Sequence, residues 1–347
     1  MDKRKLRNLE VTAVGMGCMA FSHGYGAIPD EKYSIAAIHK ALDYGCNFFD
    51  TAEVYSPNLE GIGHNEIIVG KALKNKYNNI VIATKLFIAT EEPKQDGSLY
   101  NTVRRHLEDS MKRLQTKHVN LYYLHRVNVN IPIEEVAECM GRLIDAGLIS
   151  GWGMSAISGE TLAKAHAVTP VTAVQNLYNM LERGCEKDIF PFCLKNNIGV
   201  VPFSPVGSGF LSGKITAQTE FEKFDDVRNW VPQLSKENII ANQPIVDVLA
   251  NFAKEKQASL AQIAIAWMLH KYPNVVPIPG SKNQERIIEN LGAWQVKFTD
   301  TEFVALETAL NACTIHGHRG HVEQGGSPAE VTAKNVAARK IAAQSKS

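Results

Sequence analysis

The sequence has no excess of charge of either sign, no long apolar run and no paired cysteine spacing. Lys and Arg number 37 against 36 Asp and Glu in 347 residues. This balance argues against a nucleic-acid partner or an acidic membrane surface, because both need a basic excess. Without a long apolar stretch, neither a signal peptide nor a membrane span is expected. The six scattered cysteines favour a reduced, cytoplasmic protein over a disulfide framework.

Eight short runs rich in β-branched and aromatic residues alternate with amphipathic segments that have helix start signals. The predicted strands are residues 14–18, 46–51, 80–85, 120–125, 151–155, 173–178, 199–205 and 274–280. Eight such units predict an α/β protein built as a single closed (β/α)8 TIM barrel. A doubly wound open sheet usually has fewer units and opens with G-x-G-x-x-G, and residues 15–20 lack its third glycine.

The predicted barrel domain covers residues 1–312, and residues 313–347 form a C-terminal loop and tail. Residues before Val14 are expected to cap the barrel floor as a small hairpin. The segment between the seventh and eighth strands is much longer than an ordinary loop. Its polar part, residues 212–237, contains Phe221, Phe224 and Trp230, and we interpret it as a lid or a substrate wall.

Three ionisable residues each end a predicted strand: Asp50, Lys85 and His125. A buried strand has no use for a charge at its tip unless a partner lies there. The carboxyl ends of barrel strands are where active sites are assembled, and Tyr55 follows Asp50 closely enough to reach the same opening. The alternative is a buried ion-pair network with a structural role only.

These four side chains suit the reduction of a carbonyl group. We expect the Lys85 ammonium to lower the pKa of the Tyr55 phenol, and Asp50 to keep Lys85 charged and oriented. Tyr55 then protonates the carbonyl oxygen as hydride reaches the carbon. His125 orients the carbonyl or relays the proton.

The same residues resemble the aldo-keto reductase family. Residues 50–55 are similar to its D-x-x-x-x-Y segment, and residues 83–85 and 122–127 resemble its lysine and histidine segments. The likeness extends from about Leu9 to Ala312. It is closest to the branch with F-S-P-x-G-x-G-F-L-x-G-K, here residues 203–214, and P-I-P-G-S, here residues 277–281.

This resemblance implies NADP(H) as the cofactor, bound across the barrel mouth without a Rossmann turn. It implies that Ser155 and Gln175 hold the nicotinamide carboxamide and that Tyr178 stacks on the ring. The pyrophosphate loop is matched by Ser204, Pro205, Gly207, Leu211 and Lys214, and the adenosine end by Gly280, Ser281, Lys282, Arg286, Glu289 and Asn290. Lys282 and Arg286 suit a 2′-phosphate, which favours NADPH over NADH.

The sequence therefore predicts an NADP(H)-dependent oxidoreductase that converts an aldehyde or ketone to an alcohol by hydride transfer, with Tyr55 as the proton donor. Its expected partner is a small carbonyl or alcohol substrate, with no nucleic acid or membrane; the natural substrate and oligomeric state stay open. Three departures from the family pattern, Leu124, Asn128 and Ala156, concern affinity and specificity rather than the reaction.

Several alternatives stay open. A nicotinamide-binding sensor subunit with slow redox chemistry is the second candidate. A barrel hydrolase or isomerase is disfavoured, because it would require paired carboxylates or metal ligands at the strand ends. Lys282 and Arg286 could be a solvated helix face, and Tyr178 could belong to the core. His316, His318 and His321 suggest a polar loop or a pocket wall more than a metal site, and no metal is predicted.

Overall fold

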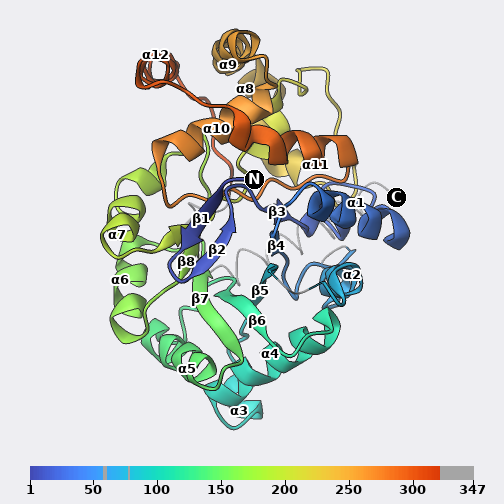
Figure 1. The fold of residues 1–347 in the computed structure, drawn as a ribbon, viewed down its shortest axis with the longest axis vertical. Helices are drawn as coiled ribbons and strands as arrows, with labels where there is room; N and C mark the ends of the chain where they lie inside the picture. Colours follow the sequence, from blue (N-terminus) through green and yellow to red (C-terminus); the bar gives the residue numbers. More distant parts are fainter. Residues whose placement is uncertain (58–60, 77–78, 321–347) are drawn as a thin grey trace.

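The computed structural model describes residues 1–57, 61–76 and 79–320. Its centre is a parallel seven-stranded sheet that curls in the order β3-β4-β5-β6-β7-β8-β9, and helices surround these strands (Figure 1). The strands are β3 Met16–Gly17, β4 Phe48–Asp50, β5 Val81–Leu86, β6 Val119–Leu124, β7 Ile149–Ser155, β8 Ala173–Gln175 and β9 Gly199–Val200. The predicted (β/α)8 architecture is thereby confirmed.

The predicted eighth strand is present as isolated bridges rather than as a strand. Val275 pairs with Val200 and Gly280 pairs with Gly17, both in parallel, so the segment joins β9 to β3 and closes the barrel. On the β3 side the carbonyls of Pro277 and Pro279 accept from Gly15 N and Gly17 N. Because proline has no N–H, this side of the segment donates nothing in return.

The predicted hairpin caps the barrel floor, as expected. It consists of β1 (Lys3–Leu6) and β2 (Leu9–Thr12), paired antiparallel. Leu6, Leu9 and Val11 pack against inward-facing strand residues such as Phe48 and Tyr123. The Arg4 guanidinium donates hydrogen bonds to the carbonyls of Tyr272 and Val275 at 2.7 and 2.8 Å, which ties the hairpin to the start of the closing segment.

The helices begin where the sequence offers capping side chains. Asp30 accepts from Tyr33 N, Ser98 from Asn101 N, and Ser259 and Thr299 form capping boxes. The helices are α1 Glu31–Asp43, α2 His64–Leu73, α3 Glu92–Gln95, α4 Leu99–Leu114, α5 Ile133–Asp145, α6 Gly159–Val168, α7 Ile189–Lys195, α8 Lys236–Ala241, α9 Gln243–Lys256, α10 Leu260–Lys271, α11 Gln284–Leu291 and α12 Asp300–Asn311. Short 3-10 turns occur at Met19–Phe21, Gly184–Glu186, Gly207–Ser212, Val227–Trp230, Pro232–Leu234 and Gly292–Gln295.

The long insertion between β9 and the closing segment contains helices α8 to α10 and a loop that reaches the barrel mouth. Asp226 pairs with Tyr25 across an antiparallel bridge. Gly24 N donates to Asp225 Oδ2 at 3.0 Å, and Val227 N donates to Gly24 O at 3.0 Å. The loop therefore lies against the segment that follows β3. In the part of the chain that the structure describes, no helix is long and apolar enough to cross a membrane.

Candidate active site

Asp50, Tyr55 and Lys85 meet at the carboxyl end of the barrel. Lys85 Nζ donates to Asp50 Oδ1 at 2.5 Å, to Thr51 O at 2.7 Å and to Tyr55 Oη at 3.2 Å. Parallel pairing of β4 with β5 sets this geometry, because it aligns Asp50 with Ala83, two residues before Lys85. Lys85 is fully buried and Asp50 is 2% exposed, so breaking the pair would leave an uncompensated charge at a cost of about 3–5 kcal/mol.

His125 completes the quartet from the end of β6. Its ring lies edge-on to Tyr55 with centroids 5.6 Å apart, and its backbone N–H donates to Leu86 O at 2.8 Å. Burial lowers the pKa of His125 well below the usual value, and the nearby positive charges of Arg126 and Lys85 add to that effect. The imidazole is therefore neutral at neutral pH, able to donate one hydrogen bond to a carbonyl oxygen.

The pKa of Tyr55 differs from the sequence-based expectation. Burial raises the pKa of Tyr55, and this effect outweighs the lowering by the Lys85 ammonium. For Lys85, burial acts to lower the pKa, but Asp50 and Tyr55 together raise it above its usual value. Tyr55 is thus a protonated phenol and Lys85 an ammonium at neutral pH, which is the state that a proton donor for carbonyl reduction requires.

The two residues predicted at the nicotinamide carboxamide, Ser155 and Gln175, end β7 and β8 beside this quartet. Gln175 Nε2 donates to Asp50 Oδ2 at 2.7 Å. Arg126 Nη1 donates to Ser155 Oγ at 2.9 Å and to His125 O at 2.6 Å. Arg126 was not among the predicted site residues, although it directly follows His125 in the sequence.

The ring of Tyr178 is turned into the core, which argues against its predicted stacking role. Its ring has no exposed surface and packs on Trp267 and Phe190 at centroid distances of 5.4 and 4.6 Å. β8 ends at Gln175, so Tyr178 lies beyond the strand and turns into the core, as its alternative interpretation stated. Phe203, directly before Ser204, keeps exposed surface.

Another aromatic side chain near the site comes from the segment after β3. The His23 ring lies 5.3 Å from the Tyr55 ring, tilted by 50°, and His23 is 7% exposed. His23 was not among the predicted site residues, because no predicted strand ends at it. Its only signal was its place in a loop on the catalytic side of the barrel.

The residues predicted around the pyrophosphate form a tight loop after β9. Ser204 and Gly207 have φ values of 52° and 56°, and Ser208, Gly209 and Gly213 continue the left-handed pattern at 55°, 101° and 70°. Pro205, Gly207 and Leu211 are buried, whereas Lys214 is exposed. Glycines in left-handed turns have no side chain, so a ligand can approach the backbone closely. Successive backbone N–H groups in such turns form concave sites for anions.

The predicted adenosine end lies at the start of α11. Lys282 Nζ donates to Tyr25 O at 2.7 Å and to Ala27 O at 2.6 Å, so two of its three donors hold the segment after β3. Gly280 pairs with Gly17, and Ser281 Oγ accepts from Asn283 N at 3.1 Å. The remaining predicted residues divide by exposure: Arg286 is exposed, Glu289 is half-buried and Asn290 is buried.

Two histidines of the C-terminal segment, His316 and His318, make hydrogen bonds through their backbone groups. His316 exchanges hydrogen bonds with the Asn242 side chain through its backbone N–H and C=O, and His318 O accepts from Gln233 N. His321 lies outside the described residues. Across residues 1–57, 61–76 and 79–320, no cluster of three His, Cys, Asp or Glu side chains has the arrangement of a metal site.

Comparison with known proteins agrees with this architecture. The model of the Aldo/keto reductase family matches residues 13–311. A relative from Glycine max, described as probable aldo-keto reductase 1, is 36% identical over 317 residues, which cover 90% of this chain and 89% of the relative.

Two solved structures have the same fold over nearly their whole length. The glycerol dehydrogenase AKR11B4 from Gluconobacter oxydans is 29% identical with a TM-score of 0.79, covering 92% of this chain and 98% of that one. An aldo/keto reductase from Klebsiella pneumoniae, crystallised with NADP and acetate, is 25% identical with a TM-score of 0.68, covering 92% and 99%. The barrel, the strand-end quartet and these matches define an oxidoreductase of carbonyl compounds. The chain belongs to the aldo-keto reductase family.

Proposed function

We propose that this protein reduces an aldehyde or ketone to an alcohol with NADPH, and that Tyr55 donates the proton. The observation that carries the proposal is the Lys85 ammonium, which contacts the Asp50 carboxylate and the Tyr55 hydroxyl at once. A phenol that accepts a hydrogen bond from a fixed cation can release its proton to a carbonyl oxygen, because the cation stabilises the phenolate that forms.

The residues at the mouth fit a nicotinamide dinucleotide. The tight loop after β9 suits a pyrophosphate, and Ser155 and Gln175 suit an amide, because both have polar side chains at strand ends. Lys282 and Arg286 at the start of α11 supply cations for a 2′-phosphate. NADP in the Klebsiella pneumoniae relative supports the same cofactor here.

The cofactor, when bound, supplies a hydride to the carbonyl carbon. The neutral His125 imidazole and the Tyr55 hydroxyl then hold the carbonyl oxygen, and the Tyr55 proton moves to that oxygen as its negative charge develops. Lys85 stabilises the resulting Tyr55 phenolate. Asp50 keeps Lys85 charged, since its carboxylate accepts from both Lys85 and Gln175.

The test compares NADPH oxidation by the wild-type protein and by Tyr55→Phe, with a reactive aromatic aldehyde as the substrate. We expect kcat to fall by about 10²–10⁴-fold in the variant. The affinity for NADPH, measured by fluorescence titration, should be unchanged.

Tyr122→Phe is the matched control, because it removes the hydroxyl of a second buried tyrosine, for which the described residues offer no hydrogen-bond partner. Equal loss in both variants would overturn the assignment of Tyr55. Cofactor binding with negligible turnover in the wild-type protein, across several carbonyl compounds, would favour the sensor alternative.

A further inference from the structure

Glu53, between Asp50 and Tyr55 in the sequence, is a buried carboxylate that the reaction itself does not use. It is 1% exposed, and its Oε1 accepts from Phe87 N at 2.6 Å. Its backbone N–H donates to Lys85 O at 3.2 Å. Glu53 therefore fastens the Tyr55 segment to Lys85 in β5 and to Phe87, the first residue after that strand.

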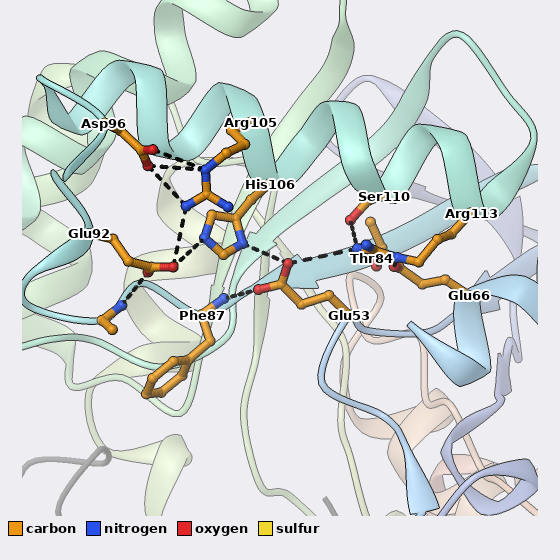
Figure 2. A network of polar contacts seen from close by, with 11 residues as sticks. Glu53, Glu66, Thr84, Phe87, Glu92, Asp96, Arg105, His106, Ser110 and Arg113 are labelled. Atoms are coloured by element: carbon orange, nitrogen blue, oxygen red, sulfur yellow. Dashed lines mark hydrogen bonds and ion pairs between the residues drawn. The ribbon is translucent and has the colours of Figure 1, made fainter. Parts of the chain in front are cut away.

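The other oxygen of this carboxylate meets a buried histidine from α4. Glu53 Oε2 lies 2.8 Å from His106 Nδ1, and His106 Nε2 lies 3.2 Å from Glu92 Oε1 on α3, as Figure 2 shows. Carboxylates only accept hydrogen bonds, and a neutral imidazole has a single N–H. Both contacts are satisfied together only when His106 is protonated.

Further charged pairs flank this contact at both ends. Arg105 holds Glu92 and Asp96 on the α3 side at 3.3 and 2.9 Å. On the other side Arg113 binds the buried Glu66 at 2.6 Å and lies 4.0 Å from Glu53. Figure 2 shows the series running from Glu66 and Arg113 at one end to Glu92 and Asp96 at the other. The charges alternate in sign, so each buried carboxylate has a cation beside it.

We propose that Glu53 and His106 are positioning residues that keep the Tyr55 segment and residues 87–98 in one arrangement, and that this arrangement requires a charged His106. Residues 87–98 follow a catalytic strand at the mouth, where substrate would be bound. The proposal rests on the proposed function. The proton donor itself stays with Lys85, so release of His106 should change substrate binding more than the chemical step.

The charges around His106 give the direction of its pH dependence. Glu53 and Glu92 face its ring, Arg105 precedes it on α4, Asp96 pairs with Arg105, and the buried Tyr122 hydroxyl and Arg113 lie near Glu53. Burial acts to lower the pKa of His106, but Glu53 and Glu92 raise it above its usual value. The charged form is therefore present at low pH and is lost as pH rises through this raised pKa.

The experiment measures KM and kcat for a neutral aldehyde between pH 6 and 9 in the wild-type protein and in His106→Asn. The asparagine amide can still donate to Glu53 but does not titrate. In the wild-type protein KM should rise on the alkaline side. In the variant KM should be raised roughly tenfold at low pH and be independent of pH, as expected for loss of a charged hydrogen bond, with kcat changed less than about threefold.

His118→Asn is the matched control. This histidine also has both ring nitrogens in hydrogen bonds, to Gly147 O and Ser150 Oγ, but it precedes β6 at the opposite end of the barrel. The positioning role would be overturned if KM of His106→Asn still rose on the alkaline side. It would also be overturned if kcat and thermal stability fell together with a rise in KM while the pH profile stayed unchanged.

Hydrogen exchange separates this proposal from the proposed function, since it needs no turnover. Amides in residues 51–57 and 87–98 should exchange faster in His106→Asn than in the wild-type protein and in His118→Asn, with the Phe87 amide among them. Unchanged exchange in these two segments contradicts the proposal, even if the enzyme is active. If no carbonyl compound is reduced but exchange responds as expected, the positioning role of Glu53 and His106 is supported and the proposed reaction is refuted.

Discussion

Gln175 Nε2 lies 2.7 Å from Asp50 Oδ2, on the oxygen that Lys85 leaves available. Both carboxylate oxygens of Asp50 are therefore occupied by donors from other strands. A residue expected to hold the cofactor thereby also orients the carboxylate behind the proton donor. We therefore propose that this one buried side chain couples cofactor binding to the chemistry.

Gln175→Leu tests this coupling. The substitution leaves Asp50 Oδ2 without its donor in a buried site, which costs about 1–3 kcal/mol. We expect weaker NADPH binding and a lower kcat, each by roughly tenfold, measured by fluorescence titration and steady-state kinetics. Gln243→Leu, which removes an exposed glutamine–aspartate contact on α9, should change neither. An effect on kcat alone would separate Gln175 from the cofactor.

Arg126→Gln tests the support of Ser155. Arg126 donates to the Ser155 hydroxyl, so that hydroxyl keeps its own hydrogen for an acceptor such as an amide oxygen. Loss of the guanidinium should weaken NADPH binding about tenfold, in line with a charged hydrogen bond, with little change in thermal stability. Arg104→Gln, at an exposed pair with Glu108, is the control. NADPH affinity that stays at the wild-type value would refute the role.

Lys282→Met tests the preference for the 2′-phosphate. We expect affinity for NADPH to fall roughly tenfold or more, whereas affinity for NADH changes little, because NADH lacks that phosphate. Titration of both cofactors against wild type and Lys254→Met, an exposed lysine of α9, provides the comparison. Equal losses for both cofactors would instead indicate that Lys282 acts through its bonds to Tyr25 and Ala27.

Gly70→Ala should destabilise the protein although alanine is the better helix former. A methyl group at this position of α2 would meet Arg113 O at 2.4 Å and Leu114 Cα at 2.7 Å, so α2 and α4 would have to separate. We expect a loss of about 1–3 kcal/mol in the free energy of unfolding, measured by urea titration. Gly184→Ala, with nothing within 4 Å, should be neutral.

The barrel and the meeting of Asp50, Tyr55, Lys85 and His125 could be predicted because their signals are local. Asp50, Lys85 and His125 each stand at the end of an apolar run, and parallel pairing brings such ends to one edge whatever the helices do. The eighth segment could be recognised as a strand-like run too. Its two prolines determined that it would pair only in part.

What could not be predicted depends on contacts between distant residues. Tyr178 follows β8 as if it continued the strand, and only Trp267 and Phe190 explain why its ring turns inward. His106 interrupts an apolar helix face of α4, which is a signal of something buried and polar. Its partners Glu53 and Glu92 could not be identified from that signal, because nothing in the local sequence specifies them.

The bonds from Arg4 to the closing segment connect residues 268 and 271 positions apart. A chain emerging from the ribosome at 5–20 residues per second needs about 14–54 s to supply the second partner. During that interval β3 presents an unpaired strand edge to other nascent chains. The barrel can therefore close only after the segment up to Gly280 has been synthesised, and the need for chaperones is greatest before that point.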